Sequence, residues 1–313
     1  MTKPEILLLA PYPQWDMVEL EANYTVHKLW EVNDRDAFVA SHANTIQAIA
    51  TDGGLGASRS LMERLTNLRI VSCYGVGTDA IDLGYARANE IRVTNTPDVL
   101  NDDVADLGIG LLLATARRIP YGERLVREGN WGKIPMPLVT RVSGKKLGII
   151  GMGSIGQAIA RRASGFDLDI GYFTRTAKPE LLHRYFSELL TLAQWSDFLM
   201  VIVPGGESTN KIVNTSVLNA LGPDGILINI SRGSTVDEGA LLDALEAKRI
   251  RGAGLDVFLN EPSIDARFTA LDNVVLQPHH GSGTVETRKA MGQLVRDNLA
   301  AHFSGMPLLT QVV

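Results

Sequence analysis

The stretch Lys146–Gly156, KLGIIGMGSIG, decides the fold class of this chain. An apolar run leads into three glycines with the spacing GxGxxG, and a helical pattern follows them. A strand that ends in such glycines turns tightly into a helix and leaves backbone N–H groups and the positive helix end free for a pyrophosphate. Gly151 would make the turn, Gly153 would let the phosphates approach, and Gly156 would let helix and strand pack closely. We therefore predict a dinucleotide-binding unit, the alternative being an ordinary strand-to-helix turn.

Short apolar runs on both sides of this motif predict buried strands that alternate with helices. Before the motif they span residues 6–10, 46–51, 69–73 and 91–94. From the motif onward they span residues 146–150, 169–173, 199–203, 226–230, 252–257 and 274–277. Such alternation is typical of parallel, doubly wound sheets. The expected fold class is α/β, with two doubly wound parallel-sheet (Rossmann-like) domains and a cleft between them.

The chain length, 313 residues, exceeds the size at which a single hydrophobic core usually stops growing. Residues 284–303 have helical spacing and could return to the first domain. We therefore expect a discontinuous domain of residues 1–99 and 286–313, and a dinucleotide-binding Rossmann domain of residues 100–285. Residues 102–118, DDVADLGIGLLLATARR, predict a helix too apolar for the surface and too short for a bilayer. We expect this helix to be buried between domains or subunits.

Composition excludes several classes of protein. The formal net charge of -5 offers no general attraction for polyanions, so we expect no nucleic-acid partner. The apolar start is too short for a signal peptide and no apolar stretch reaches the length of a membrane span, so we expect a cytoplasmic chain without a membrane partner. The single cysteine, Cys73, sits in an apolar run and reads as a buried strand thiol. The six histidines lack zinc-ligand spacing, so we expect no metal site.

The residues after the second strand of the motif region bear on the cofactor. In dinucleotide-binding folds, an acidic residue at this strand tip usually holds the ribose hydroxyls. Here the strand DIGYF runs into Thr174, Arg175 and Thr176 instead. An arginine fork can pair with a 2′-phosphate and the threonines can donate hydrogen bonds. We therefore expect NADPH/NADP to be preferred, with NADH/NAD possible; the alternative is a solvated surface arginine.

Polar residues also follow three later strands. Arg232 lies in INISRGSTVDEGALLDAL, Asp256 and Glu261 lie in GLDVFLNEP, and His279 and His280 lie in QPHHGSGT. Because the carboxyl ends of parallel strands meet at one edge of a sheet, we expect these groups to gather near the nicotinamide position.

These segments, together with YGVGTDAIDL at residues 74–83 and NTPDVLNDDVADL at residues 95–107, resemble D-isomer-specific 2-hydroxyacid dehydrogenases. Within that family the chain most resembles NADPH-dependent glyoxylate/hydroxypyruvate reductases, and the resemblance covers nearly the whole chain. It implies hydride transfer to a small 2-oxo acid, giving a D-2-hydroxy acid. It also implies a homodimer, which we expect to form through the helix region 102–118.

The resemblance makes Arg232, Glu261 and His279 the catalytic set. Reducing a 2-oxo acid requires a hydride to the carbonyl carbon, a proton to its oxygen, and a countercharge for the carboxylate. His279 as imidazolium would donate the proton, with Glu261 holding its other ring nitrogen. Arg232 would bind the carboxylate and the carbonyl oxygen. The alternatives are a surface arginine, a first-turn acid and a loop histidine.

His280 departs from the family pattern, which more often has a small or apolar residue after the catalytic histidine. It leaves open which imidazole titrates. We assign the role to His279 because it directly follows Pro278, as in the family motif.

The resemblance further implies which residues bind the cofactor. Ser154 and Ile155 would lie on the pyrophosphate, Pro204 beside the adenosine, and Ile230 and Gly281 near the nicotinamide, whose carboxamide Asp256 would hold. The full set is Gly151, Gly153, Ser154, Ile155, Gly156, Thr174, Arg175, Thr176, Val203, Pro204, Ile230, Ser231, Arg232, Asp256, His279 and Gly281.

The substrate-binding residues implied by the resemblance are Val76, Gly77, Arg232 and His279. The amides of Val76 and Gly77 would face the substrate carboxylate, which makes the domain of residues 1–99 and 286–313 a substrate-binding, flavodoxin-like domain. The alternative is a simple turn between strand and helix.

Two other functions remain open from the sequence. One is a reductase for larger 2-oxo acids such as phenylpyruvate or hydroxyphenylpyruvate, with Leu55, Tyr74, Trp131 and Met136 as candidate pocket walls. The other is a non-catalytic, dinucleotide-sensing binding protein, since dehydrogenase-like transcriptional co-repressors use the same fold. The intact set of Arg232, Glu261 and His279 weighs against the second.

Overall fold

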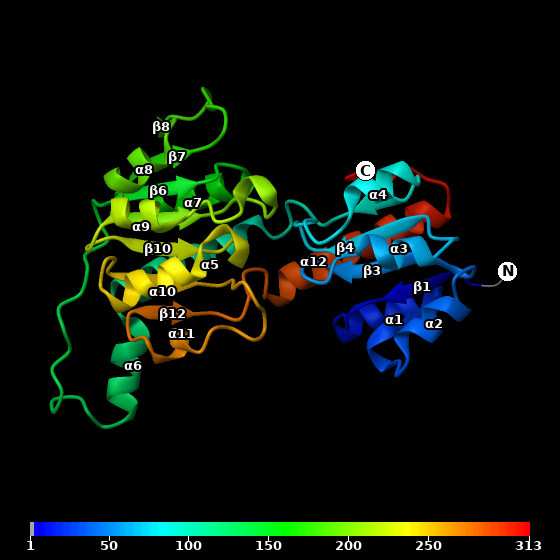
Figure 1. The fold of residues 1–313 in the computed structure, drawn as a ribbon, viewed down its shortest axis with the longest axis horizontal. Helices are drawn as coiled ribbons and strands as arrows, with labels where there is room; N and C mark the ends of the chain where they lie inside the picture. Colours follow the sequence, from blue (N-terminus) through cyan, green and yellow to red (C-terminus); the bar gives the residue numbers. More distant parts are fainter. Residues whose placement is uncertain (1–2) are drawn as a thin grey trace. The chain divides into compact units, whose positions relative to one another are not determined.

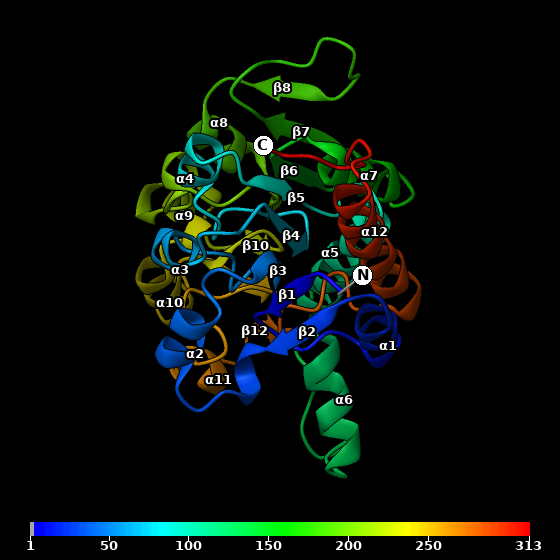
Figure 2. The same ribbon diagram turned by 90° about the vertical axis from the view of Figure 1, so that its right-hand side faces the viewer.

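The computed structural model describes residues 3–313, which form two compact units. Unit 1 comprises residues 3–100 and Ser282–Val313, and unit 2 comprises Asn101–Gly281. Each unit is a parallel sheet flanked by helices, as the ribbon shows from two directions (Figures 1 and 2). The predicted fold class, two parallel-sheet α/β regions, is confirmed.

The sheet of unit 1 has five parallel strands in the order β2-β1-β3-β4-β5. The strands are β1 (Glu5–Leu8), β2 (Thr25–Lys28), β3 (Ile46–Asp52), β4 (Ile70–Tyr74) and β5 (Arg92–Thr94). The helices are α1 (Gln14–Asn23), η1 (Leu29–Glu31), α2 (Arg35–Ser41), α3 (Arg59–Arg64), α4 (Leu83–Ala88) and α12 (Val285–Phe303). Buried side chains of α2, α3 and α4 form one core with β1, β3 and β4. The helix α12 packs against β4 and α1, which joins the end of the chain to its beginning.

The sheet of unit 2 has seven parallel strands in the order β12-β11-β10-β9-β6-β7-β8. The strands are β6 (Lys146–Ile150), β7 (Asp169–Phe173), β8 (Arg184–Phe186), β9 (Phe198–Val201), β10 (Ile226–Asn229), β11 (Gly252–Leu255) and β12 (Val274–Leu276). The helices are α5 (Asn101–Ala116), α6 (Ile119–Arg127), α7 (Ser154–Ser164), α8 (Leu189–Trp195), η2 (Glu207–Thr209), α9 (Thr215–Leu221), η3 (Gly233–Thr235), α10 (Glu238–Glu246) and α11 (Arg267–Ala270). The strand order reverses between β6 and β9, which is where a doubly wound sheet binds its ligand.

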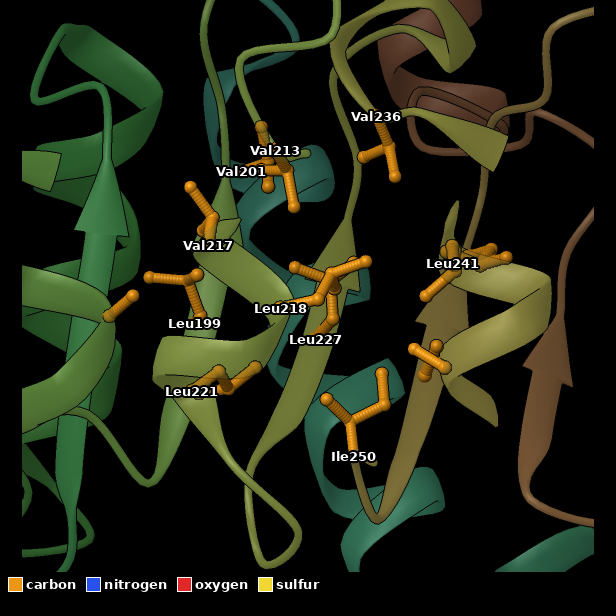
Figure 3. Packing of buried hydrophobic residues seen from close by; sticks show 14 of the residues in the cluster. Leu199, Val201, Val213, Val217, Leu218, Leu221, Leu227, Val236, Leu241 and Ile250 are labelled. Atoms are coloured by element: carbon orange, nitrogen blue, oxygen red, sulfur yellow. The ribbon is translucent and has the colours of Figure 1, made fainter. Parts of the chain in front are cut away.

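The hydrophobic core of unit 2 explains why its strands are continuous apolar runs. Leucines and valines of α8, α9 and α10 pack on one face of the sheet, and Figure 3 shows those from α9 and α10 meeting β9 and β10. The helices α5 and α7 pack against each other, and α5 also contacts β10 and β11. A strand covered on both faces has no solvent side, so alternation disappears from its sequence.

The apolar helix expected over residues 102–118 corresponds to α5, which ends two residues earlier and packs within unit 2. It ends at Ala116, and Arg118 adopts a left-handed φ of 50° before α6 begins at Ile119, with Pro120 in its first turn. Eight of its residues are buried, while Asp102 and Asp106 point outward and pair with Arg162 of α7. Much of the apolar face of this helix is therefore buried within its own unit, and a homodimer through residues 102–118 stays a prediction.

Two strands were not predicted from the sequence. They are β2 and β8, one at an edge of each sheet. Both are short and only partly buried, so they lack the apolar runs that mark the central strands.

Candidate active site

The predicted site residues of unit 2 lie along one edge of its sheet. Gly151, Thr174, Ile230 and Asp256 directly follow β6, β7, β10 and β11. Val203 and Pro204 follow β9, and His279 follows β12. All these strands are parallel, so their carboxyl ends share this edge. The chain therefore gathers the cofactor and catalytic candidates of this unit despite their wide separation in sequence.

The three motif glycines have distinct geometries. Gly151 has a φ of +101°, and a β-carbon built on it would lie 2.2 Å from the Ile202 carbonyl oxygen. A β-carbon on Gly156 would lie 2.2 Å from the Gly151 carbonyl oxygen, so the helix and the turn touch there. A β-carbon on Gly153 would meet nothing within 4 Å. The turn and the packing thus require two of the glycines, while the third borders open space at the start of α7.

The tip of β7 carries hydroxyls and a cation. Thr174 Oγ1 donates to the Thr176 carbonyl at 2.7 Å and closes a small turn. Arg175, between them, is exposed. Because the tip bears no carboxylate, it presents no charge that would repel a phosphate.

A buried asparagine shapes the loop that carries Arg232. Asn229 is 1% exposed at the end of β10. Its Oδ1 accepts from the Ser231 amide at 3.1 Å and its Nδ2 donates to the Arg232 carbonyl at 3.0 Å. Sequence reasoning missed this residue, although a polar side chain at the end of the apolar run ILIN was a signal.

The next glycine permits a close approach to the neighbouring loop. A β-carbon on Gly233 would lie 1.9 Å from the Phe258 carbonyl carbon. Only a glycine fits there, so the loop of Arg232 and the loop of Glu261 pack directly together.

Two of the three catalytic candidates, His279 and Glu261, are hydrogen-bonded to each other. His279 Nδ1 lies 2.7 Å from Glu261 Oε2, and Glu261 Oε1 accepts from the Phe258 amide at 2.8 Å. Burial raises the pKa of Glu261. The hydrogen bonds from His279 and Phe258, and the charges of His279 and Arg232, lower it by a larger amount. The net pKa of Glu261 therefore lies below its ordinary value. The ring nitrogen Nε2 of His279 lies away from this bond. The geometry therefore pairs His279 with Glu261.

Asp256 holds the backbone of the histidine loop. Its carboxylate is 2% exposed and accepts from the His280 amide at 2.7 Å and from the Gly281 amide at 2.9 Å. His279 itself has a φ of +49°, a left-handed conformation, and its amide donates to the Asp256 carbonyl at 2.8 Å. Burial raises the pKa of Asp256, and the two amide bonds only partly oppose this. Asp256 thus supports the loop that carries His279.

A second glutamate reaches the same loop. Glu238 Oε1 accepts from the Leu259 amide at 2.5 Å, one residue beyond the amide bound by Glu261. Burial, together with the charges of Asp265 and Glu261, raises the pKa of Glu238, although the Leu259 bond opposes this. Glu238 had no role in the sequence-based predictions, although it lies in the stretch STVDEGAL.

The predicted substrate residues Val76 and Gly77 lie in unit 1, in the loop after β4. Of the proposed pocket walls, Leu55 is exposed in unit 1, and Trp131 and Met136 are exposed in unit 2. Tyr74 is buried instead. Its ring packs on Tyr12 and its hydroxyl donates to the Arg288 carbonyl, so it belongs to the interior of unit 1.

No three His, Cys, Asp or Glu side chains among residues 3–313 are grouped so as to hold a metal ion. No helix in that range is both long enough and apolar enough to span a membrane.

An α/β unit with a glycine turn at the switch point and an Arg, Glu and His set at the same edge defines a nicotinamide-dependent oxidoreductase. The model of the family "D-isomer specific 2-hydroxyacid dehydrogenase, NAD binding domain" matches residues 109–281. The chain belongs to the D-isomer-specific 2-hydroxyacid dehydrogenase family. It is an NAD(P)-dependent 2-hydroxyacid dehydrogenase.

Named relatives match nearly the full chain. Glyoxylate/hydroxypyruvate reductase A of Arabidopsis thaliana is 48% identical over 308 residues, 98% of each chain. Hydroxyphenylpyruvate reductase of Plectranthus scutellarioides is 47% identical over 308 residues, again 98% of each chain. Both are named as reductases, which speaks against a non-catalytic dinucleotide sensor.

A solved structure has the same fold. The NADPH-dependent glyoxylate/hydroxypyruvate reductase of Sinorhizobium meliloti, in complex with NADP and malonate, has a TM-score of 0.93 and 42% sequence identity. The match covers 100% of this chain and 97% of that one.

Proposed function

We propose that this enzyme reduces glyoxylate and hydroxypyruvate with NADPH, giving glycolate and D-glycerate. The observation that carries the proposal is the hydrogen bond between His279 and Glu261 at the strand edge that also bears Arg232. A histidine that can donate a proton, at the same strand edge as a guanidinium, suits a substrate with adjacent carbonyl and carboxylate groups. The names of the relatives support the same substrate class.

Each catalytic residue has one role in this proposal. His279 donates a proton from Nε2 to the carbonyl oxygen, while Glu261 binds Nδ1 and stabilises the charged ring. Arg232 binds the substrate carboxylate and stabilises the negative charge that develops on the carbonyl oxygen. In the oxidative direction, His279 accepts the proton.

The chain's residues fit a nicotinamide dinucleotide. The open space at Gly153 and the first amides of α7, at Ser154 and Ile155, would hold its pyrophosphate. Thr174, Arg175 and Thr176 would hold a 2′-phosphate, which favours NADPH. The remaining candidates, Val203, Pro204, Ile230, Ser231, Asp256 and Gly281, would line the adenosine and nicotinamide ends. The dinucleotide, when bound, supplies the hydride.

Parallel initial rates with NADPH and NADH test the cofactor and the substrate together. Faster reduction of glyoxylate or hydroxypyruvate than of phenylpyruvate supports the proposal. Selective reduction of phenylpyruvate or hydroxyphenylpyruvate would overturn it in favour of a reductase for larger acids, which the hydroxyphenylpyruvate reductase relative supports.

The variant Arg175→Ala tests the basis of NADPH preference. Loss of charge-assisted bonds to a phosphate should raise the KM for NADPH about 10- to 100-fold and leave the KM for NADH unchanged. Arg251→Ala is the matched control, because Arg251 is an exposed arginine just before β11, at the opposite edge of the sheet. An unchanged KM for NADPH would mean that Arg175 is a solvated surface residue.

The enzyme is also proposed to form a homodimer, through α6 and the segment that follows it. Apolar side chains are exposed along residues 119–138, including Trp131 at 79% and Leu138 at 99%. Figure 1 shows α6 extending away from the sheet of unit 2. Exposed apolar surface of this kind marks protein interfaces.

A further inference from the structure

The first three residues of the loop that follows β4 each have a hydrogen-bonded carbonyl group. The Gly75 carbonyl accepts from the Thr96 amide at 2.9 Å. The Val76 carbonyl accepts from Asn95 Nδ2 at 2.9 Å, and the Gly77 carbonyl accepts from Cys73 Sγ at 3.5 Å. All of these partners belong to unit 1.

The direction of the carbonyls determines the direction of the amides. In a planar trans peptide, the C=O of one residue and the N–H of the next point to opposite sides. The Val76 amide therefore points away from Thr96, and the Gly77 amide points away from Asn95. Successive backbone N–H groups in a turn can form a concave site for an anion.

Asn95 is anchored by the end of the chain. Thr310 Oγ1 donates to the Asn95 carbonyl at 2.6 Å, and the Asn95 amide donates to the Thr310 carbonyl at 3.3 Å. Thr310 in turn is held by Asn298 of α12, which is fully buried. Asn298 Nδ2 donates to Thr310 Oγ1 at 2.8 Å, and Asn298 Oδ1 accepts from the amides of Leu309 and Thr310.

We propose that Asn95 is a positioning residue for the substrate carboxylate, and that Thr310 and Asn298 hold it in place. The proposal rests on the proposed function, in which the Val76 and Gly77 amides bind that carboxylate. Asn95 does not touch the substrate. It acts through the Val76 carbonyl, whose bond to Nδ2 sets the plane of the peptide that carries the Gly77 amide.

Kinetics of two pairs of variants test this role. Asn95→Ala should raise the KM for glyoxylate about tenfold, while kcat and the KM for NADPH change little. Asn89→Ala is the matched control, because Asn89 Nδ2 also donates to a backbone carbonyl of unit 1, that of Tyr85, at 2.9 Å. Thr310→Val, which loses the hydroxyl, should act like Asn95→Ala, and Thr310→Ser should retain the KM of the unaltered enzyme.

Malonate binding to the NADPH-loaded enzyme, measured by calorimetry, gives a readout that needs no turnover. Asn95→Ala and Thr310→Val should weaken it about tenfold, with Tm values close to that of the unaltered enzyme. Unchanged malonate binding in both variants, equal changes for NADPH and glyoxylate, or no malonate binding to the unaltered enzyme would overturn the inference. Weakened malonate binding in an enzyme that does not reduce glyoxylate would overturn the substrate assignment and leave the loop inference standing.

Discussion

The hydrogen bond to Glu261 distinguishes His279 from its neighbour His280. The two side chains have the same chemistry, so the residue type alone could not distinguish them. Nδ1 of His279 faces the carboxylate, and the backbone amide of His280 is bound by Asp256 instead. A left-handed φ at His279 turns the chain between them. The proposed proton donor is therefore His279, the residue that the family motif also indicated.

Replacing Glu261 tests the proton-donor assignment and its pH dependence. Because the folded pKa of Glu261 is lowered, its charge is present at neutral pH and is lost only as the pH falls through that lowered pKa. Glu261→Gln should lower kcat for glyoxylate reduction about 100-fold and move the alkaline limb of the kcat/KM profile to lower pH. The profile should be measured from pH 5 to 9, with Glu246→Gln, an exposed glutamate of α10, as control. An unshifted profile with normal kcat would contradict the assignment.

Replacing Asp256 tests the support of the histidine loop. In Asp256→Asn, one of the two amides, His280 or Gly281, loses its acceptor. The buried charge itself costs free energy, as the raised pKa indicates, so the free energy of unfolding should fall by only about 1 kcal/mol. The kcat should fall more, about tenfold or beyond, because His279 is displaced. Urea unfolding and kcat, measured on the same variant, show whether activity falls more than stability. Asp272→Asn, on the surface, is the control. Normal kcat would refute the loop-support role.

At the scale of the element, the three glycines of the turn between β6 and α7 have different structural roles. Gly151 and Gly156 leave no room for a β-carbon, whereas Gly153 faces open space. The distinction follows from three-dimensional contacts, but the GxGxxG spacing already suggested it.

A pair of alanine variants separates packing from cofactor binding. Gly156→Ala should destabilise the fold, by about 1–3 kcal/mol, because the Gly151 carbonyl must move. Gly153→Ala should leave stability near that of the unaltered enzyme and weaken NADPH binding at least tenfold, because the methyl group would occupy the phosphate position. Thermal unfolding and NADPH titration check both. Full NADPH affinity in Gly153→Ala would contradict the cofactor position.

The break between α5 and α6 lies at residues 117 and 118 and was not predicted from the apolar pattern. A proline at residue 120 favours a helix start, and the residues before it turn through the left-handed Arg118. The apolar pattern of the sequence predicts a helix that continues to residue 118. The structure ends it at Ala116, two residues before the left-handed Arg118.

At the scale of the whole molecule, the proposed homodimer depends on the exposed apolar side chains after α5. Leu138→Asp should lower the dimer's stability and shift the mass measured by light scattering towards the monomer, because a carboxylate would be buried in the interface. Leu182→Asp is the matched control, since Leu182 is a fully exposed leucine of the same unit in another loop. A monomeric unaltered enzyme, or a Leu138→Asp variant that stays dimeric, would refute this interface.

The sequence by itself determined the α/β class, the central strands, the glycine turn and the polar residues that follow the strands. These depend on periodicity and turn chemistry, which are local and can be read over a few residues. The short edge strands β2 and β8 escaped because partial burial leaves only a weak pattern.

Only the tertiary structure decided which side chains meet. It paired His279 with Glu261, placed Asn229 and Glu238 beneath the loops of the site, and buried the apolar face of α5 in its own unit. It also brought Thr310 to Asn95, 215 residues earlier in the chain. Such contacts arise when the sheets assemble, and their energy depends on distance and burial rather than on spacing along the chain.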